Sequence, residues 1–600
     1  METTKPFQRL IQIQAEKYGD KPALYDRNKL TDPWNSISWN RMNDMVNHLA
    51  KALLELGVKP QDRIGQYSQN KAENLLVDYA TFSIRGVVVP IYPTSTQQQV
   101  DFITKDAAVE ILFVDGQKQY EAALEVMKTS THLKKIIVLE QQVKLADSTH
   151  SMYFEDLIEI GMKSKKDDEV EKRRAESVEE DMGCLLYTSG TTGNPKGVVL
   201  NFVMFNEAVR IHLIRLSQVN DSDTSLAFLP LTHVFERMWC YFLLQVGTTV
   251  YINHNPTEIQ TTLKEVRPSL MCAVPRFWEK VYIGVKEVLS GYSPLKLAIV
   301  TWATAVGKKH NIDYLRKGKK PDFLLKFYYR LAEKMVFSKL KTTLGLENAK
   351  ILPVAGAKLS DEITLFFRSI GVPVVYGYGL TESTATVTCF EDEYEIGTVG
   401  SIMPEVEVKI GKDNEILLRG KTITPGYYNN PEANKKAFTD DGWFCTGDAG
   451  TIRDNKIVLT ERLKDLFKTS NGKYIAPQEI ETRVSTDKFI EQVAVIGDER
   501  NYVTAIIAPS IPALEKYAKE HKIVYQDVDE LLRLPEIKKL IEDRIAEHQQ
   551  GMASYEMIKK ITLIKIPFTI EAGELTNTLK IRRSVITQKY KNEIDAMYEA

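Results

Sequence analysis

The stretch YTSGTTGNPKG (residues 187–197) combines hydroxyl side chains, glycines and a lysine as a phosphate-binding loop would. Its glycines can turn backbone N–H groups inward, and its hydroxyls and lysine add donors and a positive charge. The residues concerned are Gly190, Gly193 and Gly197, then Thr188, Ser189, Thr191 and Thr192, and finally Lys196. Pro195 and Gly197 stand where a Walker A loop needs glycine and then serine or threonine. We expect a loop of another kind that holds a polyanion such as nucleotide phosphates, with a mobile surface loop as the alternative.

Further segments downstream carry residues suited to a nucleotide. In YGYGLTES (376–383), Tyr378 offers an aromatic face that fits a base, and Glu382 offers a hard carboxylate that fits a hard cation carrying phosphate. The other segments are VAGAKLS (354–360), GWFCTGDAG (442–450), LTERLKDLFKTSNGKYIAPQEIE (459–481) and GELTNTLKIRR (573–583). Taken singly, each of these is more often a turn, a charged linker or a solvated tail.

Together and in this order, the motifs resemble the AMP-forming adenylate superfamily of acyl-CoA synthetases, luciferases and peptide-synthetase adenylation domains. The resemblance extends over about residues 10–590. It implies that ATP and Mg²⁺ bind here, with Tyr378 stacking on adenine, Thr381 touching phosphate and Glu382 holding the metal. It also implies nucleotide contacts from Gly356, Ala357, Gly379, Asp448 and Arg462, where Asp448 accepts the ribose hydroxyls and Arg462 contacts ribose or phosphate.

The resemblance assigns the C-terminal motifs to two different reaction steps. Lys580 would be the mobile catalytic lysine of adenylation, although many long-chain members carry proline where this chain has Asn577. Gly472 and Lys473 would belong to a loop that enters the site only for thioester formation. Lys464 would be the hinge about which the C-terminal domain rotates between the two orientations.

The chemistry explains why such residues are needed. A carboxylate must first become an acyl-adenylate, so that a thiol can displace AMP instead of oxide. Both steps bring anions together, and the protein's task is to neutralise and align them. Lys196 would hold the departing pyrophosphate, while Lys580 would lie between the carboxylate and the α-phosphate.

The segment LPLTHVFERMW (229–239) bears on the acid that is activated. A lone His233 is more often a satisfied core histidine. In context, however, this segment and VPRFWEKV (274–281) resemble the long-chain fatty acyl-CoA synthetases, in which the histidine lies near the acyl carboxylate and the mouth of the fatty-acid tunnel. Some bacterial members place a gating tryptophan four residues after it, and Arg237 stands there in this chain, so the gate must differ.

These side chains must be positioned by alternating strands and helices. Runs such as AVEILFVD (108–115) and KKIIVLE (134–140) predict buried strands between amphipathic helices, and hence α/β layers with largely parallel sheets. CLLYTS (184–189) predicts a strand that enters the phosphate loop, and residues 201–216 predict the helix that follows it. We expect a large N-terminal domain of several layered subdomains (residues 1–462) and a small mobile α+β C-terminal domain (463–600).

Composition narrows the setting of the protein. The chain has 600 residues with a net charge of −2, so nothing global argues for nucleic acid. The N-terminus lacks the apolar core of a signal peptide, and the five cysteines follow no metal-binding or disulfide pattern, which together favour the cytoplasm. Residues 308–341 nevertheless carry a net charge of +8 and an apolar stripe. Either this stripe packs on the domain, or the region makes a peripheral contact with anionic lipid.

The sequence therefore predicts a long-chain fatty acid–CoA ligase that uses ATP, Mg²⁺ and CoA. A stand-alone ligase that loads fatty acid onto an acyl carrier protein is the alternative. A non-catalytic acyl-AMP or lipid-binding relative is a hypothesis of another class, against which the intact set of Lys580, Glu382, Asp448 and Arg462 argues. Chain-length preference and oligomeric state are left open.

Overall fold

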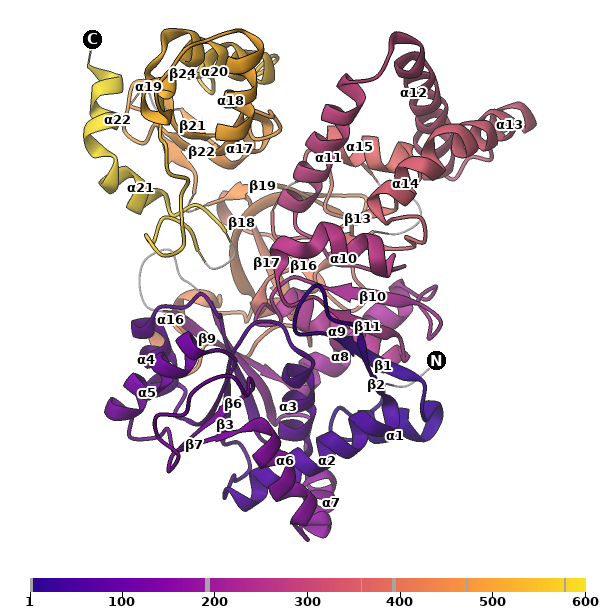
Figure 1. Ribbon diagram of the computed structural model, residues 1–600, viewed down its shortest axis with the longest axis vertical. Coiled ribbons are helices and arrows are strands. Elements are labelled where there is room, and N and C mark those ends of the chain that lie inside the picture. Colours follow the sequence, from indigo (N-terminus) through magenta and orange to yellow (C-terminus); the bar gives the residue numbers. More distant parts are fainter. Residues whose placement is uncertain are drawn as a thin grey trace.

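A computed structural model describes residues 4–188, 195–357, 359–390, 395–463, 465–470, 473–576 and 579–599. Within these residues, three β-sheets and their helices form a large N-terminal part, and a small α+β part follows at the C-terminal end (Figure 1). The fold class predicted from the sequence, a layered α/β domain with a small C-terminal α+β domain, is confirmed.

The first sheet is built from the buried β-branched runs of the N-terminal third. Its strands in spatial order are β7 (Ser151–Tyr153), β6 (Lys135–Val138), β5 (Val109–Val114), β3 (Arg63–Tyr67), β4 (Val87–Ile91), β8 (Met182–Thr188) and β9 (Lys196–Asn201). The helices that alternate with them are α2 (Trp39–Glu55), α3 (Ala72–Ser83), α4 (Gln97–Asp106), α5 (Gln117–Thr129), α6 (Phe154–Lys163) and α7 (Asp167–Ala175). All strand pairs except β8–β9 are parallel, as the alternating pattern predicts.

The strand predicted before the phosphate loop and the helix predicted after it are confirmed as β8 and α8 (Phe202–Arg215), but a further strand lies between the loop and the helix. After the loop the chain does not enter a helix directly but forms β9, which returns antiparallel to β8, and helix α8 begins only then. Gly197 lies in this strand opposite Tyr187, and a Cβ at Gly197 would lie 3.0 Å from the Tyr187 ring. Gly197 thus serves strand packing, and its predicted contribution to phosphate binding stays a prediction.

Among the described residues, the second sheet has four strands and is mixed, with both parallel and antiparallel pairs. Its strands in spatial order are β10 (Thr224–Ala227), β11 (Thr249–Ile252), β1 (Pro22–Asp26) and β2 (Asn35–Ser38). Its helices include α1 (Leu10–Tyr18), α8, α9 (Val234–Val246) and α10 (Ile259–Val266). His233 caps α9, because its Nδ1 accepts from the Phe235 N–H at 3.2 Å, and Gly247 ends the helix at φ +95°.

The third sheet is mostly antiparallel. Its strands in spatial order are β12 (Leu352–Val354), β13 (Val374–Tyr378), β14 (Thr388–Cys389), β15 (Ser401–Ile402), β19 (Lys456–Arg462), β18 (Phe444–Arg453), β17 (Glu415–Arg419) and β16 (Glu407–Ile410). Only β12 and β13 run parallel. The expectation of largely parallel sheets is therefore wrong here, and short hairpins join β16 to β17 and β18 to β19. Helices α15 (Asp361–Ser369) and α16 (Pro431–Ala437) accompany this sheet.

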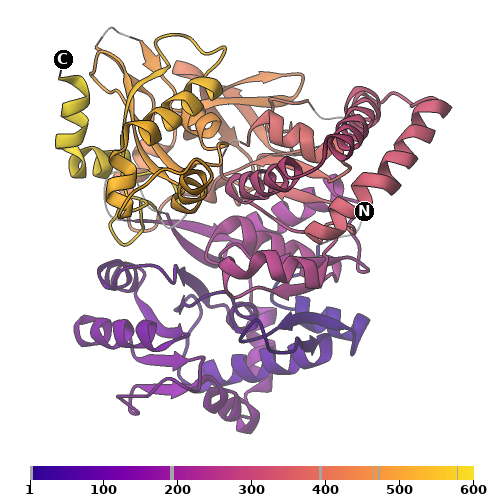
Figure 2. The same ribbon diagram turned by 45° about the horizontal axis from the view of Figure 1, so that its top comes forward.

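A helical module projects from the body of the molecule between the second and third sheets (Figures 1 and 2). It consists of α11 (Pro275–Ser290), α12 (Pro294–Gly307), the π-helix η2 (Lys308–Tyr314), α13 (Phe323–Ala332), the π-helix η4 (Glu333–Phe337) and α14 (Ser338–Leu344). The chain then passes from α14 into β12. Among the described residues, no helix has the length and apolar character needed to cross a membrane.

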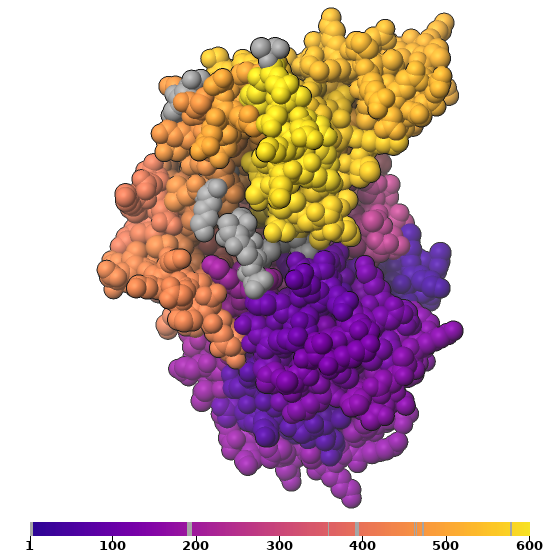
Figure 3. Space-filling view, turned by 90° about the vertical axis from the view of Figure 1, so that its left-hand side faces the viewer, coloured from indigo at the N-terminus to yellow at the C-terminus, as the bar shows by residue number. Residues whose placement is uncertain are grey.

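The C-terminal part has two apolar clusters of its own. Its strands are β20 (Phe467–Lys468), β21 (Tyr474–Ile475), β22 (Ile490–Ile496), β23 (Val503–Pro509) and β24 (Ile558–Leu563), and its helices are α17 (Pro477–Val484), α18 (Ile511–Glu520), α19 (Val528–Arg533), α20 (Pro535–His548), α21 (Arg583–Lys589) and α22 (Lys591–Tyr598). The predicted strand pair β22–β23 is confirmed. In the space-filling view the C-terminal part, in gold and yellow, lies above the indigo and violet N-terminal part (Figure 3).

Candidate active site

Asp448 and Arg462 face each other across two antiparallel strands. The register of β18 and β19 sets them opposite one another, and Arg462 Nε lies 3.1 Å from Asp448 Oδ1. Asp448 is buried, whereas the Arg462 side chain is 39% exposed. A guanidinium has five N–H donors, so Arg462 can still bind an anion from its open side. The two residues predicted for ribose and phosphate are thus adjacent.

Tyr378, at the end of β13, joins this pair. Its hydroxyl donates to Asp448 Oδ2 at 2.7 Å. Both oxygens of Asp448 are engaged, but each carries two lone pairs, and ribose hydroxyls can still donate to them. The next residue, Gly379, approaches the backbone so closely that a Cβ would lie 2.2 Å from the Ala385 carbonyl oxygen. Only glycine fits this turn.

Gly356 and Ala357 follow β12, the parallel neighbour of β13. Because parallel strands end at the same edge of a sheet, the loop after β12 and the loop after β13 emerge side by side. Gly356 has φ +93°, in the left-handed region that favours glycine. The two loops predicted to line the nucleotide therefore share one edge of the third sheet.

Glu382 lies in the short turn η5 (Thr381–Ser383), and both Thr381 and Glu382 are half-buried. The Tyr427 hydroxyl donates to Glu382 Oε1 at 2.8 Å. The Lys196 ammonium lies 4.9 Å from the centre of the Tyr427 ring. One tyrosine thus links the predicted metal ligand to the predicted phosphate lysine.

The backbone of the segment around Tyr427 also forms hydrogen bonds with the turn that carries Glu382 and with strand β9. Thr424 N–H donates to the Glu382 carbonyl oxygen at 2.7 Å, and Tyr428 N–H donates to the Gly197 carbonyl oxygen at 2.7 Å. Sequence reasoning missed Tyr427. The signal, two tyrosines after Pro-Gly in TPGYYNN, does not show which of the two rings faces the site.

Lys580 reaches the same centre from the C-terminal part. It is half-buried, and its pKa is lowered to about 8 by burial and by the positive charge of Arg462. The carboxylates of Asp448, Asp465 and Glu382 oppose this shift and favour the protonated lysine. Lys580 is therefore within electrostatic range of the groups predicted for ribose, phosphate and metal.

His233 also lies within electrostatic range of Lys580. Burial, together with the positive charge of Lys580, lowers the pKa of His233 to about 4. The imidazole is consequently neutral at physiological pH. Because its Nδ1 accepts from the Phe235 N–H, the proton is on Nε2, which can donate to a carboxylate.

The carboxylate of Glu382 fits a magnesium ion whose other ligands come mainly from the phosphates of the substrate. Among the described residues, no group of three or more histidine, cysteine, aspartate or glutamate side chains is placed to hold a metal. Mg²⁺ in nucleotide sites is commonly bound by one or two carboxylates together with substrate phosphates and waters. Glu382, oriented by Tyr427, would supply such a carboxylate.

Several predicted residues lie outside the described ranges. They are Ser189, Gly190, Thr191, Thr192 and Gly193 of the phosphate loop, the hinge residue Lys464, and Gly472. Thr188 and Lys196, which flank the loop, pair across β8 and β9 and are both half-buried. The two stems of the loop thus lie beside Tyr427.

Lys473 is not brought to this centre. It is exposed on the C-terminal part, with its ammonium 5.5 Å from the centre of the Tyr555 ring. The contacts of the C-terminal part with α11 include an Arg276 bond to the Glu491 carbonyl oxygen and a 2.7 Å pair between Lys516 and Glu287. In this orientation Lys580 faces the site and Lys473 does not.

Arg237 has no role as a gate. It is fully buried and forms an ion pair with Asp78, and its Nε donates to the Leu231 carbonyl oxygen at 2.6 Å. Tyr241 also donates to Asp78, at 2.8 Å. The arginine that replaces the gating tryptophan therefore ties α9 to α3 in the core, and the inference that the gate must differ fits this position.

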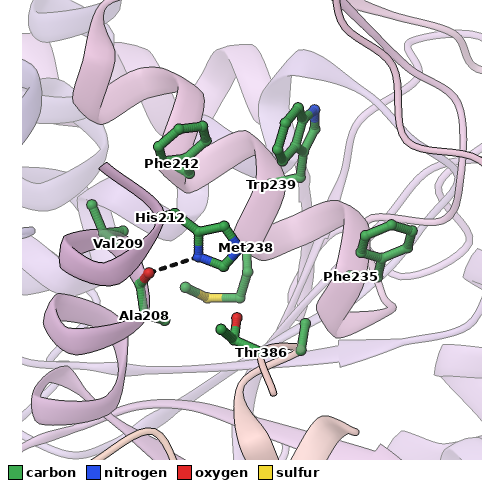
Figure 4. A pocket seen from close by; sticks show the side chains of 9 residues that line it. Ala208, Val209, His212, Phe235, Met238, Trp239, Phe242 and Thr386 are labelled. Atoms are coloured by element: carbon green, nitrogen blue, oxygen red, sulfur yellow. Dashed lines mark hydrogen bonds between the residues drawn. The ribbon is translucent and has the colours of Figure 1, made fainter. Parts of the chain in front are cut away.

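An apolar pocket lies between α8 and α9 (Figure 4). It is lined by Ala208, Val209, His212, Phe235, Met238, Trp239, Phe242, Ala385 and Thr386. His212 Nδ1 donates to the Ala208 carbonyl oxygen at 2.7 Å, and burial lowers the pKa of His212. The cavity of about 40 Å³ has room for a few methylene-sized groups, so side chains such as Met238 must move before a longer chain can enter.

Comparisons with solved structures show the fold that this site uses. The adenylation domain of a carboxylate reductase from Mycobacterium chelonae superimposes with a TM-score of 0.78 at 21% identity, covering 100% of this chain and 92% of that one. The A-PCP didomain of a carboxylic acid reductase from Segniliparus rugosus, in complex with AMP, superimposes with a TM-score of 0.77 at 20% identity, covering 100% and 82%.

Sequence comparisons agree with this fold along the whole chain. A long-chain-fatty-acid–CoA ligase of Mycobacterium bovis (FadD15) is 29% identical over 96% of this chain and 95% of its own length. The long-chain-fatty-acid–CoA ligase ACSBG2 of Mus musculus is 27% identical over 100% and 93%, and long chain acyl-CoA synthetase 4 of Arabidopsis thaliana is 28% identical over 98% and 91%. The model of the AMP-binding enzyme family matches residues 11–428, and that of the AMP-binding enzyme C-terminal domain matches residues 464–600. The chain thus belongs to the AMP-binding, adenylate-forming enzyme family.

Proposed function

We propose that this protein is a long-chain fatty acid–CoA ligase that works through an acyl-adenylate. The observation that carries the proposal is the position of Lys580, which lies within electrostatic range of Arg462, Asp448, Glu382 and His233. These residues come from distant segments of the chain. Their assembly around one lysine is what a reaction between a carboxylate and a polyphosphate needs.

In the first half-reaction, a carboxylate oxygen of the fatty acid attacks the α-phosphorus of ATP, and pyrophosphate leaves. Protonated Lys580 attracts both anions and reduces their repulsion, while neutral His233 donates to the carboxylate. Asp448 and Arg462 hold the ribose and phosphate, and Lys196 holds the departing pyrophosphate. Mg²⁺, when bound at Glu382, supplies further neutralisation of phosphate charge.

In the second half-reaction, the thiol of CoA attacks the acyl carbonyl and AMP leaves. We propose that the C-terminal domain (463–600) rotates about Lys464 for this step, so that Gly472 and Lys473 replace Lys580 at the site. The contacts seen with α11 favour an interface that can open. Lys516 and Glu287 are exposed, and exposed ion pairs contribute only about 0–1 kcal/mol.

The acyl chain would occupy the pocket between α8 and α9. Phe235, Met238 and Trp239 give it an apolar lining one helical turn from His233, where the carboxylate would bind. Each buried CH₂ contributes about 0.8 kcal/mol, so a long chain gains much affinity here. The long-chain ligase names of the relatives support the same substrate class.

A ligase that loads acyl carrier protein is the second candidate, since the adenylation site would be the same. Pyrophosphate release with ATP and saturated acids from C6 to C20, with and without CoA, distinguishes the candidates. We expect release with palmitate and formation of palmitoyl-CoA. Product formation only with a carrier protein would favour the second candidate, and strongest activity below C8 would contradict the long-chain assignment.

A further inference from the structure

Helices α12 and α13 expose an unusual amount of apolar surface. α12 carries a single charged side chain, Lys296, yet only Ala303 and Gly307 of this helix are buried. In α13, only Leu325 and Ala332 are buried. The two helices pack on each other, with Trp302 edge-on to Tyr328 at 6.4 Å, and project from the body (Figures 1 and 2).

The apolar residues of α13 form two stripes on different sides of the helix. The inner stripe packs on the module, with Leu325 buried and the Tyr329 ring stacked on His310 at 4.0 Å. The outer stripe is Leu324, Phe327, Tyr328, Leu331 and Met335, whose spacing places them on one face. The outer stripe is exposed, with Phe327 53% exposed. For these five residues, the alternative in which the predicted stripe packs on the domain is wrong, whereas Leu340, its sixth residue, is half-buried against the core.

A row of positive charge runs along the flank of the outer stripe. Lys326, Arg330 and Lys334 follow one another at intervals of four residues. Within the part of the chain that the structure describes, none of the three forms an ion pair with a carboxylate. Lys319 and Lys320 add charge in the loop before Phe323, which is 83% exposed.

We propose that this face docks on the surface of an anionic lipid bilayer, with Phe323, Leu324, Phe327 and Leu331 entering the headgroup region and Lys326, Arg330 and Lys334 contacting the lipid phosphates. We call it the tip surface. Apolar side chains flanked by lysine and arginine on an exposed helix are what interfacial binding requires. Basic residues near an anionic membrane each contribute about 1 kcal/mol of attraction.

The charge distribution selects this occupant. Residues 308–341 carry +8 while the whole chain carries −2, so the rest of the chain carries −10. An anionic surface therefore attracts the tip surface and repels the rest, which orients the protein. A second copy meeting the tip surface face to face would bring like charges together, and that is unfavourable.

Docking would leave the site on the body accessible. From the module the chain runs through α14 into β12, whose end carries Gly356 beside the nucleotide loops. The segment that contacts the bilayer is thus continuous with the segment that leads into the site. The inference does not depend on which acid the protein activates.

Sedimentation of the full chain with vesicles tests the proposal in the absence of ATP and CoA. The vesicles are phosphatidylcholine alone or with 30 mol% phosphatidylglycerol. We expect binding to the anionic vesicles and little to the neutral ones. The triple variant K326Q/R330Q/K334Q should bind about 100-fold more weakly, and F323S/F327S at least tenfold more weakly.

Matched controls lie on the C-terminal part. K519Q/K538Q/K539Q removes three exposed lysines, and V524S/I566S removes two exposed apolar side chains. Both controls should bind like the unchanged protein, and thermal midpoints should stay equal because every position is exposed. Equal binding to neutral and anionic vesicles would overturn the proposal, and so would equal losses in control and tip variants. No vesicle binding at all would overturn it in favour of a protein partner. None of these outcomes bears on acyl-CoA formation, which is measured separately.

Discussion

Two clusters in this protein have the same composition and opposite surroundings. In each, an aspartate accepts a hydrogen bond from a tyrosine hydroxyl and pairs with an arginine. One consists of Asp78, Arg237 and Tyr241, and the other of Asp448, Arg462 and Tyr378. The first is closed within the core, with side-chain exposures of 0% and 2% for its ion pair, whereas Arg462 of the second is 39% exposed.

The difference teaches that burial decides what such a cluster does. Burial raises the pKa of Asp78, although Arg237 and the hydrogen bonds that Asp78 accepts oppose this shift. The charged form of the carboxylate therefore depends on these partners. Arg237 in turn fixes the Leu231 carbonyl oxygen. Nothing in this cluster is left to meet a ligand. The second cluster keeps an open side, and can therefore hold ribose and phosphate.

Removing the two aspartates should separate these roles most strongly. D78A leaves the Arg237 charge buried without its partner, and we expect the free energy of unfolding to fall by about 3–5 kcal/mol. D448A leaves Arg462 near water, and should cost about 1 kcal/mol or less. Urea unfolding followed by tryptophan fluorescence measures both. Equal losses in the two variants would contradict the comparison.

Lys580 extends the comparison, because it acts on the second cluster, through Arg462 and Asp448. K580A should lower the rate of adenylation by about 10²–10³, which corresponds to about 3–4 kcal/mol, because the charge between the carboxylate and the α-phosphate is lost. Thioester formation from supplied acyl-adenylate should be spared. K473A is the reciprocal variant: Lys473 is exposed beside Tyr555 in this orientation, so adenylation should be unchanged, while thioester formation should fall. A loss of both half-reactions in K580A would count against two orientations.

Most of the second cluster could be predicted from sequence, and none of the first. Asp448, Arg462, Tyr378 and Lys580 lie in short motifs that say little singly, but whose order along the chain resembles that of the adenylate-forming family. Arg237, by contrast, finds Asp78 at a separation of 159 residues, and only the packing of α9 on α3 reveals that pair.

Two features could not be predicted for the same reason, which is that both depend on contacts the sequence does not show. They are the strand β9 and the exposure of the apolar stripe on α13. Strand β9 was not predicted, because its first residues belong to the phosphate motif and the sequence does not show their pairing with β8. The spacing of the apolar residues in α13 predicted the stripe, but spacing does not say whether a stripe faces the core or the solvent.

The pH dependence of adenylation should follow Lys580. The pKa of Lys580 is lowered to about 8, so the ammonium is lost as pH rises through 8, and kcat/KM for ATP should fall about tenfold per pH unit, or about 100-fold by pH 10. Stability should move the other way. An unfolded lysine titrates near pH 10.4, so between pH 8 and 10.4 only the unfolded chain keeps this proton, and the contribution of Lys580 to stability rises with pH. The residual adenylation of K580A should lack this alkaline limb. A limb of equal position in K580A would assign it to another group.

Tyr427 offers the finest test, because its hydroxyl, like those of Tyr241 and Tyr378, donates to a carboxylate. Y427F keeps the ring beside Lys196 but removes the donor that orients Glu382, and groups that orient a metal ligand in this way typically change metal affinity about tenfold or more. We expect the Mg²⁺ concentration for half-maximal ATP binding, measured by calorimetry, to rise about tenfold with little change in stability. Y428F is the matched control, because Tyr428 accepts from Arg63 at 3.0 Å and makes no contact with Glu382 that the described residues show. If Y427F and Y428F shift the Mg²⁺ requirement equally, Tyr427 only supports the fold. It would then resemble Tyr241 of the closed cluster, and not Tyr378 of the open one.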